Sequence, residues 1–360
     1  MNNQVLFIGS FKLPVTGYYG GVYFASTSLR DKMEQEDIKV IELDTTLKDI
    51  SVTEVYKRLP TIIARGFYFL YKIMFSPKAN SLFIFVSAGN SYIDKLPSIL
   101  LARMLRKKVV VFPRSGHFNN DYNKRFYRFF IKKALKYSNT IICQSSYWYD
   151  YFVTKGLDED KLRVIENWVP NKTLKISVGL SYPNYNINSD ETFRMVFVSR
   201  IEEAKGITDI LNVVKVLPKE LNYQIDIYGE GSYKDEFLES IKSNGFDDII
   251  KYKGWLDKND MQKTLNSYHL ALFASRVEGY PNSLLDFIFS KIPIIAYAIP
   301  SVKAVGNDKV LYYNDVNDMA DKIMYSYHNY QEVLLLAKKL YEVKVIRNNI
   351  DYTFSQIPLK

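Results

Sequence analysis

Two carboxylates bracket the start of an expected helix in the segment 275–286. Glu278 lies in a Gly-Tyr-Pro loop that follows an apolar run, and Asp286 lies in the early turns of the helical stretch after it. A helix N-terminus presents unpaired N–H groups and a partial positive charge, so it suits phosphate. Carboxylates beside it can accept hydrogen bonds from sugar hydroxyls. The segment therefore predicts a site for a nucleotide sugar, with two ordinary surface acids at a helix start as the alternative.

Two cations follow another expected strand, 194–199. Arg200 can hold phosphate oxygens in a planar fork, and Lys205 adds a mobile point charge. Gly206 lets the backbone turn from this loop into the next helix. The pattern predicts binding of a phosphorylated ligand, and a solvated loop with ordinary charges is the alternative.

Glycines mark two further strand–loop–helix junctions. Gly229 and Gly231 follow the expected strand 223–229, and Gly20 and Gly21 precede the first expected helix. Glycine permits close approach of the backbone to a ligand, although an ordinary turn or a mobile loop explains each pair equally well. The dinucleotide-binding fingerprint is excluded because the third glycine is missing.

One of the three histidines, His117, follows an expected strand end beside a glycine. This position favours a role in a ligand site, although a lone histidine is more often structural. No spacing of Cys and His residues suggests a metal site, so no metal is expected.

Short apolar runs alternate with amphipathic stretches along the whole chain, which predicts parallel sheets covered by helices on both faces. The expected fold is therefore α/β, with two Rossmann-like doubly wound domains, 1–175 and 190–335, joined through a linker at 171–191. Residues 336–360 are expected to form a helical tail that packs back on the first domain. The expected strands are 5–9, 39–43, 81–86, 109–113, 140–144, 194–199, 223–229, 249–253, 271–274 and 293–297. The expected helices are 23–34, 96–105, 124–137, 206–216, 233–244, 258–268 and 283–289.

Bulk composition fits a globular protein with anionic partners. The 360 residues are 47% hydrophobic and carry a net charge of +9. No apolar run reaches the roughly 18 residues that a membrane-spanning helix needs. The first residues lack a signal-peptide pattern, and Cys143 is the single cysteine. We therefore expect a cytoplasmic protein.

Basic residues stand beside aromatic or other apolar residues in four stretches of the first half: 56–58, 65–72, 103–108 and 124–133. Such stretches can lie on an anionic bilayer, with rings at the acyl boundary and cations at the headgroups. The alternative is an aromatic stripe that faces the core and a solvated basic back. None of the usual nucleic-acid-binding modules is present, so nucleic acid is not an expected partner.

In combination, these motifs resemble the family 4 retaining glycosyltransferases, which have the GT-B architecture of two Rossmann-like domains facing a cleft. The resemblance is strongest from Arg194 to about Val310 and weaker over the first 170 residues. Its motifs are Ser199-Arg200…Lys205-Gly206, Tyr228-Gly229-Glu230-Gly231, Lys253-Gly254-Trp255 and Glu278-Gly279-Tyr280-Pro281…Asp286.

The resemblance implies a role for each matching residue. Arg200 and Lys205 would neutralise the leaving diphosphate, Glu278 would bind hydroxyls of the donor sugar, and His117 would line the donor sugar and acceptor. Asp286, which stands where the family usually has Glu, would bind ribose hydroxyls. The remaining donor contacts would come from Gly20, Gly21, Gly229, Gly231 and the backbone of Asn282, Ser283 and Leu284.

The resemblance also implies no metal and no cofactor beyond the nucleotide-diphosphate sugar, with a UDP-sugar as the expected donor. The predicted function is transfer of a sugar to a lipid-linked or surface-polysaccharide acceptor, at the inner face of the cell membrane. Two alternatives stay open: another enzyme of the same fold, such as a nucleotide-sugar epimerase, and a degenerate sugar-nucleotide-binding protein. The sugar, the base, the acceptor and the oligomeric state cannot be read from the sequence.

Overall fold

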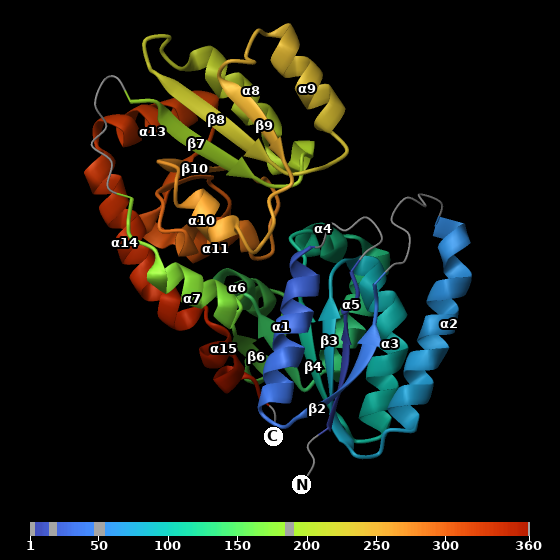
Figure 1. Ribbon diagram of the computed structural model, residues 1–360. Helices are drawn as coiled ribbons and strands as arrows, with labels where there is room; N and C mark the ends of the chain where they lie inside the picture. The colour runs from blue at the N-terminus through green and yellow to red at the C-terminus, as the bar shows by residue number, and fades with distance from the viewer. Residues whose placement is uncertain (1–3, 14–19, 47–54, 184–190, 359–360) are drawn as a thin grey trace. The chain divides into compact units, whose positions relative to one another are not determined.

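The computed structural model describes residues 4–13, 20–46, 55–183 and 191–358 (Figure 1). The chain forms two compact units. The first contains Met1–Trp168 together with Ile350–Lys360, and the second contains Val169–Asn349. The expected tail, 336–360, is therefore divided between the two units.

The first unit is built on a parallel six-stranded sheet in the order β2-β1-β3-β4-β5-β6. Alternate residues of each strand point to opposite faces, and both faces are buried. In β1, for example, Leu6 and Ile8 belong to one core cluster, and Val5 and Phe7 belong to the other. The strands are β1 (Gln4–Gly9), β2 (Lys39–Asp44), β3 (Ala79–Val86), β4 (Lys108–Pro113), β5 (Thr140–Cys143) and β6 (Leu162–Val164).

Helices cover both faces of this sheet. On one face the core is closed by α2 (Val55–Met74), α3 (Gly89–Met104), α4 (Phe118–Asn123), α5 (Arg125–Tyr137) and α6 (Ser146–Thr154). On the other it is closed by α1 (Gly21–Gln35) and residues of the last segment, which contains α15 (Ile350–Gln356). A 3-10 turn, η1 (Glu159–Lys161), precedes β6.

The second unit has a parallel six-stranded sheet in the order β12-β11-β10-β7-β8-β9. This is the strand order of a doubly wound dinucleotide-binding fold. Its second and third strands are added on one side of the first strand, and its fourth to sixth strands are added on the other side. The strands are β7 (Phe193–Val198), β8 (Tyr223–Tyr228), β9 (Ile250–Gly254), β10 (Leu270–Phe273), β11 (Ile294–Tyr297) and β12 (Leu311–Tyr313).

The helices of the second unit again divide between two core clusters. One contains residues of α8 (Ile207–Val216), α9 (Lys234–Ser243), α13 (Val316–His328) and the start of α14 (Tyr330–Arg347). The other contains residues of α10 (Met261–Leu265), α11 (Asn282–Phe289), α12 (Pro300–Gly306) and the second half of α14. The remaining elements are α7 (Asn171–Gly179), η2 (Glu203–Lys205) and η3 (Asn307–Lys309).

The α/β fold with two Rossmann-like units is confirmed, and each expected strand lies within a few residues of an observed one. The short strands β6 and β12 are absent from the sequence prediction. The expected linker at 171–191 is wrong at its start, because α7 occupies Asn171–Gly179. This helix has little periodicity of its own. It is held by packing on α10 and α11, which is how tertiary contact overrides weak local propensity.

Candidate functional site

The strand order of the second unit places two of the predicted motifs at one point of its sheet. Strands β7 and β10 are neighbours, with β8 and β9 on one side and β11 and β12 on the other. Ligands of open α/β sheets bind at such a reversal, outside the carboxyl ends of the strands. The loops that leave this point are 199–206, which contains Arg200 and Lys205, and 274–281, which contains Glu278.

The structure brings two of the predicted catalytic residues into direct contact. Lys205 Nζ lies 2.6 Å from Glu278 Oε1, and the two side chains are only 15% and 16% exposed. Each comes from a different strand end, so neither loop alone makes the pair. A cation and an acid held together in a half-buried position can serve a ligand that carries both phosphate and hydroxyl groups.

Glycines let these loops pack directly against one another. Gly206 has φ of 72°, and a Cβ there would lie 2.1 Å from the carbonyl oxygen of Ala274 in the other loop. Gly229 has φ of 142°, and its Cβ would lie 1.8 Å from the carbonyl oxygen of Ser199. A Cβ at Gly231 would likewise meet the backbone of Ile201. These contacts between loops account for the glycines, and contact of Gly229 and Gly231 with a donor stays a prediction.

Arg276, which sequence reasoning gave no role, fixes the loop that carries Glu278. Its Nη2 atom lies 2.8 Å and 2.7 Å from the two carboxylate oxygens of Asp209 in α8. Its guanidinium also lies 3.6 Å from the ring centroid of Tyr297, and the buried hydroxyl of Tyr313 donates to the same Asp209. The backbone N–H of Arg276 donates to the carbonyl of Ala204, beside Lys205. Arg276 is therefore a positioning residue for the Lys205–Glu278 pair.

Arg200 is not part of this pair. Its side chain is 64% exposed, and Nη1 lies 2.6 Å from Glu202 Oε1. The structure thus separates the two predicted cations: Lys205 is held in a half-buried contact with Glu278, whereas Arg200 is held by a neighbouring residue at the surface. An exposed arginine can change rotamer at little cost, so the predicted role of Arg200 stays a prediction.

The second predicted carboxylate, Asp286, lies inside α11. It is buried, and its carboxylate pairs with Lys258 Nζ from the segment after β9. Burial raises the pKa of Asp286, and the lysine opposes that rise. Sequence reasoning missed Lys258, and the signal that could have found it was a cation just beyond the Lys253-Gly254-Trp255 motif.

The other predicted donor contacts lie at the start of α11. Asn282 and Ser283 are half-buried in the first turn, which begins after Pro281. The side chain of Leu284 is fully buried in the core, so only its backbone could meet a donor. Their placement at a helix N-terminus is the one that the sequence predicted, and their contact with a ligand stays a prediction.

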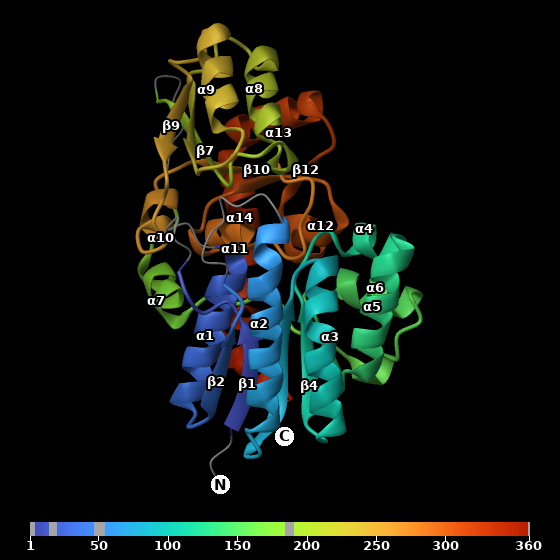
Figure 2. The ribbon, with the colours of Figure 1, turned by 90° about the vertical axis from the view of Figure 1, so that its right-hand side faces the viewer.

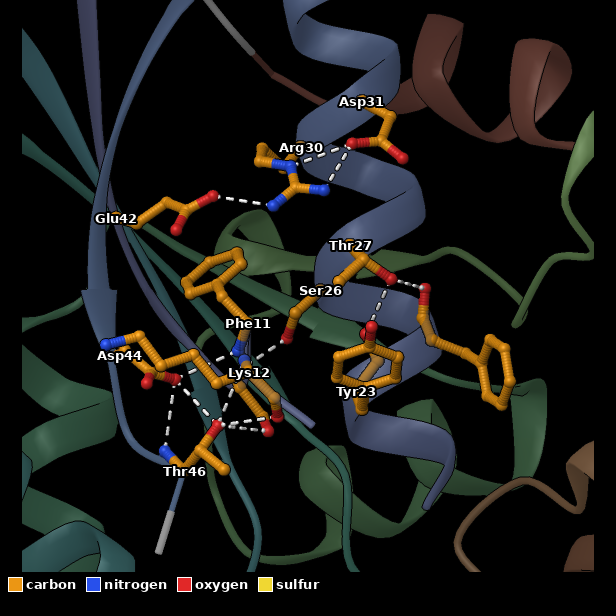
Figure 3. Close-up of polar contacts among 12 residues, drawn as sticks. Phe11, Lys12, Tyr23, Ser26, Thr27, Arg30, Asp31, Glu42, Asp44 and Thr46 are labelled. Atoms are coloured by element: carbon orange, nitrogen blue, oxygen red, sulfur yellow. Dashed lines mark hydrogen bonds and ion pairs between the residues drawn. The ribbon is translucent and has the colours of Figure 1, made fainter. Parts of the chain in front are cut away.

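In the first unit, the strand order reverses between β1 and β3. Hydrogen bonds hold the loop after β1 against the end of β2, as Figure 3 shows. Asp44 Oδ1 accepts from the backbone N–H of Phe11 at 2.9 Å and from the hydroxyl of Thr46 at 2.7 Å. The hydroxyl of Ser26 in α1 accepts from the backbone N–H of Ser10. This unit therefore holds its loop with backbone and hydroxyl groups on one carboxylate.

The first-unit residues predicted for the site are at helix starts. Gly20 is exposed and directly precedes α1, Gly21 is its first residue, and a Cβ at Gly20 would meet no heavy atom within 4 Å. His117 is exposed and directly precedes α4, with its backbone N–H donated to Ser115 Oγ. Residues 14–19 of the predicted glycine loop lie outside the described residues.

Within the described ranges, no three His, Cys, Asp or Glu side chains gather in a way that could hold a metal ion. The metal independence that the resemblance implies stays a prediction.

Residues 192–329 match the family model described as glycosyl transferases group 1. This segment is a glycosyl transferases group 1 domain. It contains Arg200, Lys205, Glu278 and Asp286, whereas Gly20, Gly21 and His117 lie outside it.

Two proteins of similar sequence are named as glycosyltransferases. The poly(ribitol-phosphate) alpha-N-acetylglucosaminyltransferase of Staphylococcus aureus (strain COL) is 30% identical over 138 residues, which are 37% of this chain and 28% of that protein. The capsular polysaccharide biosynthesis glycosyltransferase CapH of Staphylococcus aureus is 25% identical over 251 residues, 68% of this chain and 66% of that protein. The chain thus spans less than two thirds of the length of either relative.

Among solved structures, HepE of Anabaena in complex with UDP superimposes with a TM-score of 0.72 at 12% sequence identity. The match covers 98% of each chain. At this identity the likeness concerns the fold, which is the GT-B type.

Proposed function

We propose that the chain is a retaining glycosyltransferase that moves a hexose-type sugar from a nucleotide-diphosphate sugar to a lipid-linked or surface-polysaccharide acceptor. The observation that carries the proposal is the Lys205–Glu278 contact at the strand reversal of a glycosyl transferases group 1 domain. The expected place of work is the cytoplasm, at the inner face of the cell membrane.

The charges of the pair suit the reaction. As a sugar–phosphate bond breaks, positive charge develops on the sugar and negative charge on the leaving diphosphate. A lysine fixed beside that diphosphate stabilises the transition state without reorganising first. Glu278 holds Lys205 in place and has a second carboxylate oxygen for hydroxyls of the donor sugar. Arg200, once it leaves Glu202, adds a second cation.

The buried Asp286 has a separate role in this proposal. Burial raises the pKa of Asp286, and Lys258 opposes that rise and so favours the ionised carboxylate, which can accept hydrogen bonds from ribose hydroxyls. The shorter side chain of Asp, compared with Glu, requires the ribose to lie closer to α11.

Retention of configuration follows in this proposal from attack on the same face that the diphosphate leaves. The departing phosphate oxygen then takes the proton of the acceptor hydroxyl, and the sugar–oxygen bond to the acceptor forms as the sugar–phosphate bond breaks. Such a step needs no protein nucleophile. It also needs no metal, because Lys205 and Arg200 supply the positive charge.

The similar proteins support the choice of substrates. Two Staphylococcus aureus relatives are named for a poly(ribitol-phosphate) and for capsular polysaccharide, which supports a surface glycan as acceptor. The HepE structure holds UDP, which supports a uridine donor.

A calorimetric titration with UDP, GDP and ADP, with and without chelator, tests the donor site. We expect one nucleotide to bind with the same affinity in chelator and at least about tenfold more weakly to Lys205→Ala. Lys322→Ala removes a lysine that lies beside Asp318 in α13 of the same unit, and it should bind as the wild type does. No binding of any of the three nucleotides by folded wild type would refute the proposal.

One observation favours a binding protein without turnover: the exposed side chain of Arg200 pairs with Glu202. Release of free nucleoside diphosphate across a panel of UDP-sugars and acceptors separates the two functions. Tight binding without release under all conditions would support the binding protein, and release that depends on an acceptor would support the transferase.

A further inference from the structure

The outward side of α2 is apolar along its described length. Leu59, Ile63, Phe67 and Tyr71 are 51%, 49%, 69% and 57% exposed, and their spacing of four places them in one stripe on the helix. Met74 and Phe75 continue the exposed apolar surface at the helix end. Between residues 59 and 75, no exposed side chain carries a charge.

The inward side of the same helix packs against the rest of the first unit. Phe69 and Ile73 are buried in the core, and the guanidinium of Arg65 pairs with Asp94 at 3.2 Å. Lys72 lies half-buried, with Nζ 5.5 Å from the ring centroid of Tyr68. The described residues therefore leave the outer stripe of α2 uncovered, and a soluble protein rarely exposes so long an apolar surface.

Two neighbouring helices also expose large apolar side chains. Figure 2 shows α2, α3 and α5 side by side, and α3 packs against both of the others. Met104 of α3 is 79% exposed, and Phe126 and Phe129 of α5 are 64% and 56% exposed. The buried residues of α5 are instead Ile131, Ala134 and Leu135, so a core-facing aromatic stripe is ruled out for Phe126 and Phe129.

The same part of the chain concentrates positive charge. Residues 55–149 contain 17 Lys and Arg but only two acids, Asp94 and Asp121, whereas the rest of the chain has 31 Lys and Arg against 37 Asp and Glu. Both acids are used internally, Asp94 by Arg65 and Asp121 by the backbone N–H of Gly89. The exposed cations on or beside α3 and α5 are Arg103, Arg106, Lys108, Lys124, Arg125, Lys132, Lys133 and Lys136.

We propose that the outer stripe of α2 lies in the surface of an anionic lipid bilayer, with Phe67 and Tyr71 at the acyl boundary and the cations of α3 and α5 at the headgroups. Apolar and aromatic side chains beside Lys and Arg are the pattern of interfacial helices, and anionic lipid attracts such cations. A second copy of the chain would instead bring two strongly basic surfaces together. No helix in the described parts of the chain is long and apolar enough to cross a membrane.

This surface belongs to the first unit, and its binding requires neither donor nor acceptor. The inference deepens the membrane location in the proposed function by naming the surface that makes the contact, and because vesicle binding and nucleotide binding are measured separately, either can fail without the other.

Vesicle flotation of the full chain tests the inference, with phosphatidylcholine alone and with phosphatidylcholine containing about one-third phosphatidylglycerol. We expect binding to the anionic vesicles only. Phe67→Glu should reduce partitioning at least about tenfold. Ile346→Glu, at a 63% exposed residue of α14 in the second unit, makes the same chemical change away from the stripe and should bind as the wild type does.

Two further variants separate insertion from simple attraction. Phe67→Lys adds positive charge but removes an inserted ring, so insertion predicts weaker binding and attraction alone predicts equal or stronger binding. The double variant Lys132→Ser/Lys133→Ser should bind more weakly, whereas Lys338→Ser/Lys339→Ser on α14 should not. Melting curves confirm that each variant is folded.

Three results would overturn the inference. One is a wild type that does not float with anionic vesicles. The second is Phe67→Glu and Phe67→Lys both binding as the wild type does. The third is a wild-type dimer in sedimentation velocity that Phe67→Glu converts to monomer, which would show that a second copy covers the stripe.

Discussion

The two units hold the loops at their strand reversals by different means. In the second unit, ion pairs between loops and helices fix the backbone: Lys205 with Glu278, and Arg276 with Asp209. In the first unit, the described part of the loop after β1 is held by backbone N–H groups and hydroxyls on Asp44. Among the described residues, the second unit pairs a cation with an acid from the other loop at its reversal point, and such a fixed cation is what the proposed stabilisation of a leaving diphosphate requires.

The two units also differ in how their exposed apolar residues are distributed. The first unit exposes the apolar stripe of α2 together with Phe126 and Phe129, whereas large exposed apolar residues of the second unit, such as Val178 and Ile346, are spread over several elements. The Lys205–Glu278 pair of the proposed donor site thus lies in one unit and the proposed membrane contact in the other.

The largest expected effect comes from removing the fixed cation. Lys205→Ala should lower kcat/KM about 10²–10³-fold, equivalent to about 2.7–4 kcal/mol, because the leaving diphosphate loses a positioned charge. Initial rates of nucleoside-diphosphate release measure this effect. Unchanged kcat/KM in Lys205→Ala would show that the second unit does not use its fixed cation.

Breaking the anchor of the Glu278 loop should affect stability. Arg276→Ala leaves Asp209, which is 5% exposed, without its cation, and should lower the free energy of unfolding by about 2–3 kcal/mol. Urea denaturation measures the change, and Arg347→Ala at an exposed position of α14 is the control. Equal stability of the two variants would contradict the anchoring role.

Strands β7 and β10 are also joined at the ends away from the site, and this contact should respond to pH. His269 Nδ1 accepts from the backbone N–H of Arg194, and burial together with the Arg194 charge lowers the pKa of His269 to about 4. A lowered pKa means that the unfolded chain binds the proton first, so stability falls as the pH drops from about 6.5 towards 4, by about 2–3 kcal/mol. Glu191, 3.9 Å from Nε2, would reduce the effect as the ring charges.

Urea midpoints across this pH range, for wild type and His269→Asn, measure the contribution. The variant keeps an acceptor for Arg194 but does not titrate, so its pH dependence should be flatter. Exposed His328→Asn should leave the wild-type dependence unchanged, and equal profiles for all three proteins would refute the assignment to His269.

The smallest expected effect lies in the first unit. Asp44→Ala removes the acceptor of the Phe11 N–H and the Thr46 hydroxyl, and should lower the free energy of unfolding by about 1–2 kcal/mol. Asp44→Asn keeps a carbonyl oxygen and should recover most of that loss. A larger loss in Asp44→Ala than in Arg276→Ala would reverse the comparison between the two loops.

Much of the fold could be predicted because local signals were strong. Apolar runs bounded by Gly, Pro and charged residues located β1 and β7 closely, and they placed Lys205 and Glu278 after strands. Which cation meets Glu278 could not be predicted, because Arg200 and Lys205 share one loop and the partner is about 70 residues away. The sequence also could not predict whether the apolar stripe of α2 faces the core or the solvent, because the spacing of apolar residues is the same in both cases.

The division of the chain has a consequence for synthesis on the ribosome. The first unit buries Ile350 and Ile357 against the same sheet face as Phe7 and Trp168, yet these residues follow the whole of the second unit in the chain. The second unit is a continuous segment, 169–349, whose two ends are joined by the bridge between Val169 and Asn349. During translation the core of the second unit can therefore form first. The sheet face of the first unit that packs against α15 becomes complete only after that helix is made.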